Sequence, residues 1–350
     1  MRRFLTTSAT LDRGIGLVAL VLVALGPVAF SAYWVSFILT QTFWLGIAAT
    51  SMIFLSAYGG MVSLGQVGIY GVAGIVLGNV VTTGQVKGLH LGWNPWLGVV
   101  LAIVIATVVG LLLGALASRS TGIYFLMLTL TFGVLIYYFF SSVTSFSGFS
   151  GISGIQGHTP SVVGDPTNHP NRLYYIALVA ALLVYLGVRY LVRTPFGLTL
   201  QGIRDDPVRM ASLGYNVELH RTLAFGLSAF VASLAGVLFV WWNDHVDPTS
   251  FGLGPIIDLL IVGVIGSLYR LEGAWVGAFA FILINNYTHD VNVPVVGGSF
   301  NTVIGVIFLA IVLLSPGGLL GIWEWLNRQA RELMTGAGAA TLAKARPVKP

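Results

Sequence analysis

The sequence predicts an all-α polytopic membrane protein with about ten transmembrane helices and a short cytoplasmic coupling helix. Charged residues make up only 8% of the 350 residues, whereas a soluble domain carries about 25%. Hydrophobic residues make up 56%, and the mean hydropathy is +0.88. The 44 glycines agree with this class, because small residues let transmembrane helices approach one another closely.

Apolar runs long enough to cross about 30 Å of hydrocarbon follow one another along the whole chain. In order, these predicted spans are 14–31, 35–58, 62–81, 95–117, 122–141, 173–192, 222–242, 255–269, 273–288 and 300–314. We interpret the first as a retained span, because no small-residue cleavage pattern follows it. Three glycines interrupt the segment between the second and third spans, and broken helices at membrane depth usually line a path.

The basic residues fix the predicted orientation. With the N-terminus inside, only Lys87 and Arg172 of the 17 basic residues lie outside, as the positive-inside rule requires. Both termini are therefore predicted to be cytoplasmic. This distribution also explains the pI of about 9.5 without a nucleic-acid partner. The predicted divisions are a cytoplasmic N-terminus (1–13), a transmembrane domain (14–322) and a C-terminal segment (323–350). The transmembrane domain includes an outer loop (142–171) and a cytoplasmic coupling loop (193–221). The C-terminal segment is predicted to be an interfacial helix, which contacts membrane lipid, followed by a disordered cytoplasmic tail.

A stretch of mixed charge at 194–237 stands out in a chain that is otherwise almost uncharged. In its middle, Asp206 suits a helix N-cap, Pro207 the first helical position, and Gly214 the left-handed end of a helix. A helix of about two turns is too short to be stable alone in water. We interpret it as a helix that docks into a partner protein; the alternative is a surface loop with one incidental turn. The predicted coupling residues are Arg204, Asp205, Asp206, Pro207, Arg209, Ala211, Leu213 and Gly214.

A small number of polar and glycine residues inside the predicted bundle are candidates for lining a translocation path. The predicted path residues are Gly59, Gly60, Gln66, Asn79 and Thr129. The alternative for the glycines is ordinary helix packing, which is the commoner use of small residues in a membrane. The alternative for the threonine is a hydrogen bond from its hydroxyl back to its own helix.

Several kinds of chemistry are excluded by the residues themselves. The lysines, Lys87, Lys344 and Lys349, all lack the glycines and Ser/Thr of a phosphate-binding loop. Acidic residues map to loops or span ends, and only Asp258, near an outer end, lies inside a predicted span, which argues against proton coupling. Cysteine is absent, and the histidines lie in loops or at span ends. The chain is therefore predicted to be a transport subunit and not an enzyme, with no cofactor or metal of its own.

Several ordered motifs resemble one known family. The longest is TPFGLTLQGIRDDPVRMASLGYNVELHRTLAFGLSAFVASLAGVLF, and shorter ones are SLGQVGIYGVAG, TGIYFLMLTLTFGVLIYY, DPTSFGLGPIIDLLIVGVIGSL with EGAWVGAF, and LLSPGGLLGI. Together they cover most of 35–322. On these motifs the chain resembles the membrane permease subunits of branched-chain amino acid ABC transporters.

The resemblance implies a set of partners and a location. The partners are a second homologous permease subunit, two cytoplasmic ATP-binding subunits that hydrolyse ATP, and a periplasmic or lipid-anchored substrate-binding protein. The location is the bacterial inner membrane, and residues 204–214 are the segment inserted into the ATPase. Relatives carry leucine-type amino acids, urea, short amides or other small solutes, so the substrate stays open. The alternative function is a self-sufficient channel or secondary facilitator.

Overall fold

A computed structural model describes residues 26–29, 31, 33–83, 88–89, 91–164 and 170–288, together with 305, 309 and 317–321. The first and tenth predicted spans, 14–31 and 300–314, lie mostly outside this part of the chain. The predicted terminal segments, 1–13 and 323–350, lie wholly outside it.

The described residues are mostly helical and their only sheet is a pair of two-residue strands, so the predicted all-α class is confirmed. The helices are α2 (Gly26–Ala29), η1 (Trp34–Leu39), α3 (Thr40–Gly59), α4 (Gln66–Val81), α5 (Pro95–Ala117), α6 (Ile123–Ser142), η2 (Gln156–His158), α7 (Pro170–Leu191), α8 (Pro195–Asp205), α9 (Pro207–Ser212), α10 (Val217–Asn243), η3 (Pro248–Phe251), α11 (Leu253–Gly266) and α12 (Gly273–Thr288). The strands are β1 (Ile152–Ser153) and β2 (His245–Val246).

Six helical stretches in the described part are long and apolar enough to cross a membrane. They are η1 with α3, α5, α6, α7, α10, and η3 with α11, while α4 and α12 are shorter apolar helices. Eight of the predicted spans thus correspond to helices. The third begins at Gln66 rather than at 62, and the seventh already begins at Val217.

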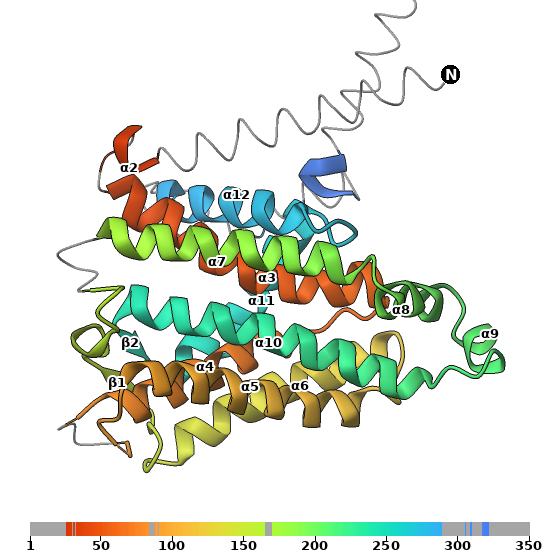
Figure 1. Cartoon of the computed structure of the whole chain (residues 1–350), viewed down its shortest axis with the longest axis horizontal. Helices are drawn as coiled ribbons and strands as arrows, with labels where there is room; N and C mark the ends of the chain where they lie inside the picture. The colour runs from red at the N-terminus through yellow and green to blue at the C-terminus, as the bar shows by residue number, and fades with distance from the viewer. Residues whose placement is uncertain are drawn as a thin grey trace, which may run out of the picture.

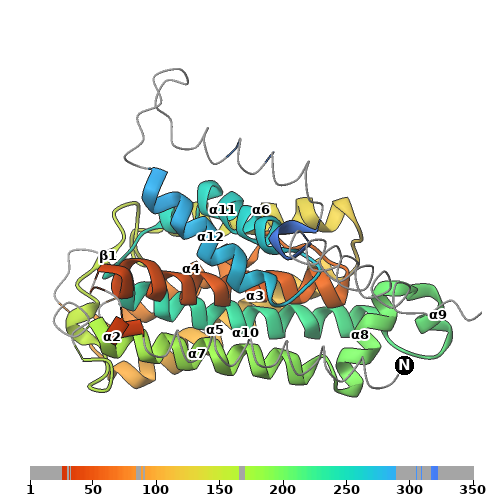
Figure 2. The same cartoon turned by 90° about the horizontal axis from the view of Figure 1, so that it is seen from above.

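The long helices lie side by side, with the small sheet at one end and α8 and α9 at the other (Figure 1). We call these the β end and the α9 end. Seen from above, α7 lies along one side of the bundle and α6 and α11 along the other (Figure 2). Of the eight arginines in the described part, Arg172 lies at the β end and the other seven lie at the α9 end. The described helices therefore sort the basic residues as the sequence predicts.

Helices α3 and α4 form the centre of the bundle. Nearly every residue of both is buried, which fits their apolar character on all sides. Helix α5 instead buries only a stripe of small residues: Gly98, Ala102, Ala106, Gly110, Gly114 and Ala117. Phe225 of α10 fills the space beside Gly114. The large apolar side chains of α5 point outward, as on a surface solvated by lipid.

The predicted outer loop is partly folded against the β end. β1 pairs antiparallel with β2, Ile152 opposite Val246. The amide of Gln156 donates to Asp244 Oδ1 at 2.6 Å. Asp247 caps η3, and although its burial would raise its pKa, hydrogen bonds from Ser250 and Thr249 lower it below the usual value. Contacts to α10 and η3 thus hold the loop in place.

Helices α11 and α12 touch backbone to backbone at the α9 end. A Cβ atom at Gly277 would overlap the carbonyl oxygen of Val262, and one at Gly266 would overlap that of Gly273. Such close approach needs residues without side chains. These glycines therefore serve packing between α11 and α12.

We expect Gly277→Ala to destabilise the protein by about 1–3 kcal/mol, because the added methyl group forces α11 and α12 apart. Gly187→Ala on α7 is the matched control, since no atom lies within 4 Å of a Cβ built there. The midpoint of thermal unfolding in detergent can be measured by fluorescence-detected gel filtration. It should fall by several degrees for Gly277→Ala and stay unchanged for Gly187→Ala. Equal midpoints would contradict this account of the contact.

Candidate coupling surface and translocation path

Helix α8 begins directly after α7 and was missed in the sequence, where 193–221 was expected to be a loop with one short helix. The side chain of Thr194 accepts from the amide of Gly197, and Pro195 occupies the first turn. Gln201 Nε2 donates to the carbonyl of Val192 at 3.1 Å. The Thr-Pro pair is a standard helix start and could have predicted α8.

Arg204 fastens α8 to the end of α3. Its Nη1 donates to the carbonyl of Ala57, and its Nε donates to Asp205 Oδ1 at 2.8 Å. The last carbonyls of a helix have no partner within the helix, so the guanidinium satisfies one of them. Gly60 follows at φ +66, and a Cβ atom there would lie 2.7 Å from Arg204 Cγ. The structure thus places Arg204 against α3, with its hydrogen bonds directed into this chain.

Helix α9 has the start and end that the sequence predicts. Asp206 Oδ1 accepts from the amide of Arg209 at 2.9 Å, and Pro207 is the first helical residue. Gly214 has φ +91 and donates to the carbonyl of Ala211 at 3.0 Å. A residue with a side chain would adopt this left-handed conformation only with strain.

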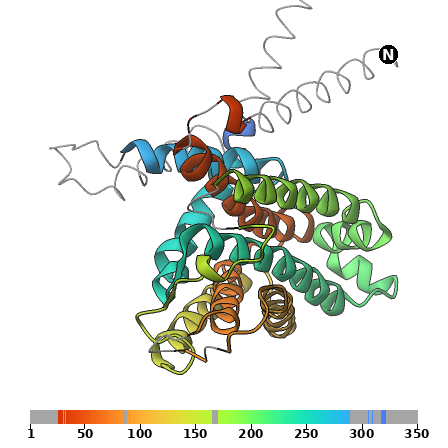
Figure 3. The ribbon, with the colours of Figure 1, turned by 60° about the vertical axis from the view of Figure 1, so that its left-hand side comes forward.

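Met210 joins α9 to α8. Its sulfur would lie 2.9 Å from a Cβ atom at Gly202. The rest of α9 projects beyond the bundle (Figure 1), and the green segment with α8 and α9 leaves it beside α7 and α10 (Figure 3). The anchored base and projecting tip make α9 a defined knob on this end of the protein.

The surface of this knob mixes apolar and charged side chains. Val208 is 75% exposed, Leu213 65% and Tyr215 44%. Arg209 and Ala211 are exposed beside them. Large exposed apolar side chains that cluster on a projecting helix are more typical of a surface that contacts another protein than of a loop exposed to solvent.

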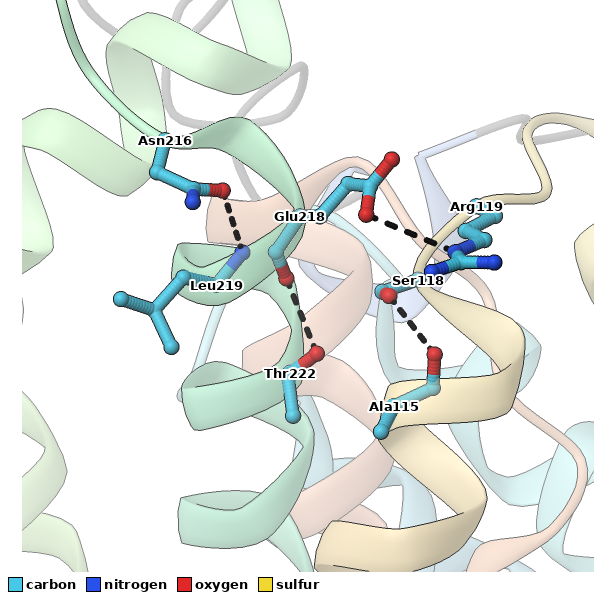
Figure 4. A network of polar contacts seen from close by, with 7 residues as sticks. All are labelled: Ala115, Ser118, Arg119, Asn216, Glu218, Leu219 and Thr222. Carbon is cyan, nitrogen blue, oxygen red and sulfur yellow. Dashed lines mark hydrogen bonds and ion pairs between the residues drawn. The ribbon is translucent and has the colours of Figure 1, made fainter.

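At the same end, α5 and α10 are linked by an ion pair. Arg119 Nε lies 3.5 Å from Glu218 Oε2, and Asn216 caps α10 by accepting from the amide of Leu219 (Figure 4). Both charged side chains are largely exposed, at 79% and 61%. Such a pair contributes less than about 1 kcal/mol to stability.

Two of the predicted path residues hold the fold together. Asn79 Nδ2 donates to the carbonyls of Ile75 and Phe146, and its Oδ1 accepts from the amide of Leu89. Thr129 Oγ1 donates to the carbonyl of Leu126 and accepts from the amide of Leu64 at 3.1 Å. Each side chain is satisfied within the chain, so neither needs a solute.

The other three path residues lie around the break between α3 and α4. Gly59 ends α3, and Gly60 caps it in the left-handed conformation. Gln66 is the first residue of α4 and is fully buried. Its Nε2 donates to Ser63 Oγ at 3.4 Å, but its Oε1 has no hydrogen-bond partner among the described residues. Of the five predicted path residues, Gln66 is the one with an unused polar atom.

These features define a multi-pass α-helical membrane protein with a short helix, α9, that projects at one end. The profile of the family described as "Branched-chain amino acid transport system / permease component" matches residues 34–314. The chain belongs to this family.

Proteins with similar sequences have names that agree with this family. The chain is 24% identical over 271 residues to the "High-affinity branched-chain amino acid transport system permease protein LivM" of Escherichia coli strain K12, an alignment covering 71% of this chain and 61% of that protein. It is 23% identical over 299 residues to a "Probable branched-chain amino acid transport permease protein LivM" of Methanocaldococcus jannaschii, covering 79% and 84%. The chain thus spans about three fifths of the length of the E. coli relative. No solved structure matches it.

We expect Asp206→Ala to loosen α9 while leaving the bundle intact, because it removes the N-cap. Loss of such a cap costs about 1 kcal/mol, so amide hydrogen exchange in 207–214 should quicken roughly five-fold. Ser212→Ala is the control, since Ser212 Oγ only donates back to the carbonyl of Val208 at 3.0 Å. Unchanged exchange in the Asp206 variant, measured by mass spectrometry, would argue against the capping role.

Proposed function

We propose that this chain is the permease subunit of an ATP-binding cassette importer. It forms part of the path for branched-chain amino acids, or a related small polar solute, across the bacterial inner membrane. Membership of the permease family and the names of the relatives support this proposal. The sequence has no phosphate-binding loop, so ATP is hydrolysed by partner subunits.

The observation that carries the proposal is the anchored and projecting α9. Two cytoplasmic ATP-binding subunits are the proposed partners, one for this chain and one for a second homologous permease. Val208 and Leu213 supply apolar contact area, and the exposed charges of Asp205 and Arg209 orient docking. Arg204, by contrast, transmits the contact by its bond to the end of α3.

The arginine distribution supports an orientation with the α9 end in the cytoplasm. Both termini are then cytoplasmic, as the order of spans predicts. The β end faces the periplasm, where the folded outer loop offers a surface for a substrate-binding protein. The proposed complex thus meets its ATPases and its binding protein at opposite ends of the bundle.

We expect Val208→Asp and Leu213→Asp each to reduce co-purification of the ATP-binding subunits more than ten-fold. A carboxylate introduced at the contact must be desolvated on docking and would be left there without a partner, which is costly. Val162→Asp, on the outer loop and 62% exposed in the wild type, adds the same charge at the other end and should not affect ATPase association.

The control for function is vesicles that contain this chain alone. The importer predicts no solute flux without the partner subunits and ATP. Flux from the isolated chain, together with normal behaviour of both α9 variants, would instead establish a self-sufficient channel or facilitator.

A further inference from the structure

The outer loop reaches into the β end of the bundle and covers the end of α4. Ile152 and Ile155 of this loop are fully buried. Both pack on Gly78, where a Cβ atom would lie 3.2 Å from the Cδ1 atom of each. Gly78 stands three residues before Val81, the last residue of α4. Two side chains of an irregular loop therefore fill the space beside the last turn of this central helix.

Short segments continue to cover the same side of α4 deeper in the bundle. A Cβ atom at Gly74 would lie 3.2 Å from Val246 Cγ2 of β2, and Phe251 of η3 fills the space beside Gly71. Gly71 stands ten residues before Val81, about 15 Å along the helix axis. Irregular backbone at such depth in a membrane is tolerated only where it is buried in protein or lines a water-filled cavity, and in transporters it usually lines the path. This side of α4 is therefore the candidate entrance from the outer face.

The base of the outer loop is fixed to the bundle. Asn79 of α4 donates to the carbonyl of Phe146 at 2.6 Å, and Ser147 Oγ donates to the carbonyl of Phe140 of α6 at 3.2 Å. Gly148 follows directly, with φ +58. Because glycine adopts either hand of backbone at little cost, the chain can change direction at this residue. The loop beyond Gly148 can therefore move while its base stays in place.

Beyond that point, Gln156 supplies a polar contact that can be released. Its Nε2 donates to the carbonyls of Trp241 and Trp242, at 3.0 Å and 3.1 Å, near the end of α10. The last four carbonyls of a helix have no partner within the helix, and either a side chain or water can satisfy them. Since water can replace the amide of Gln156 there, release of this contact leaves neither carbonyl without a partner.

We propose that residues 149–163 form a lid over the outer end of the translocation path, with Gly148 as its hinge and Gln156 as its latch. The lid is closed in this structure. It lifts to admit the solute, and Ile152 and Ile155 then leave Gly78. The inference rests on the proposed importer function and adds to it the element that opens the outer end. A loop that serves packing alone would instead stay in place throughout transport.

The first test is a disulfide that ties the lid to the segment after α10. Ser153 of β1 is directly opposite His245 of β2, and Ser153 Oγ lies 2.7 Å from His245 Nδ1. The Cα atoms of opposite residues in an antiparallel pair are about 4.5–5.5 Å apart, which a disulfide can span. The chain has no cysteine, so Ser153→Cys combined with His245→Cys can form one defined bond within it.

The measurement is ATP-dependent uptake of radiolabelled leucine by vesicles that contain the complete transporter, with the binding protein outside and ATP inside. Oxidation of the double variant should lower uptake at least ten-fold, and reduction should restore it. Each single-cysteine variant, treated in the same way, is a control and should keep its uptake. Equal uptake by the cross-linked and reduced double variant would overturn the lid while leaving the importer standing. Absence of ATP-dependent uptake by the wild type would overturn the importer function itself.

A second measurement decides the matter if the double variant fails to assemble or to cross-link. Ile155→Cys places a thiol where the closed lid buries it. A membrane-impermeant methanethiosulfonate reagent added outside should label this thiol at least ten-fold faster with ATP and leucine-loaded binding protein than without them. Val162→Cys is the control, because Val162 is exposed on the lid and should be labelled equally fast in both conditions. Equal rates for Ile155→Cys would contradict the proposal.

The latch is tested in the same Ile155→Cys background. Gln156→Met removes the amide that donates to the end of α10, so the lid should open more often at rest. The labelling rate without ATP should then rise several-fold. An unchanged rate would show that Gln156 does not hold the lid closed.

Discussion

Backbone groups inside a bilayer must find partners within the protein, and the break between α3 and α4 shows how this chain meets that requirement. The chain leaves the helix at Gly60 and re-enters one at Gln66. Side chains satisfy the groups exposed by the break: Arg204 binds a carbonyl at the end of α3, Thr129 accepts from the amide of Leu64, and Ser63 accepts from that of Gly65. The break is therefore held by α8, by α6 and by a local hydrogen bond of its own.

The same contacts join the projecting helix to the interior. Met210 of α9 packs on Gly202 of α8, Arg204 of α8 binds α3, and the segment beyond Gly60 leads to Gln66. A series of packed residues transmits a conformational change only where some structural element in it can adopt two conformations. Gly60 is suited to be that element, since glycine adopts either hand of backbone at little cost. In the proposed importer, movement of α9 would thus reach the start of α4 through a short series of packed residues.

Local patterns predicted what depends on neighbours in the chain. Hydropathy located eight described spans within a few residues, and Asp206, Pro207 and Gly214 defined α9. What depends on distant residues could not be foreseen. Thr129 is held in place by Leu64 and Asn79 by Phe146, far apart in the sequence. The position of α11 depends on η3, which packs Phe251 against Gly71 inside the bundle before α11 begins. This turn contains Pro248, Thr249 and Ser250, so it falls outside the apolar run from which the eighth span was predicted.

The interior of the bundle has few polar side chains, which suits a translocation path more than a site that binds its solute tightly. Conduction needs binding strong enough for entry and weak enough for release. High-affinity selection is then left to the proposed binding protein at the β end, where the solute is captured from water. A tighter site in the bundle would slow release, so in the proposed importer the scarcity of polar groups in the interior favours rapid transport.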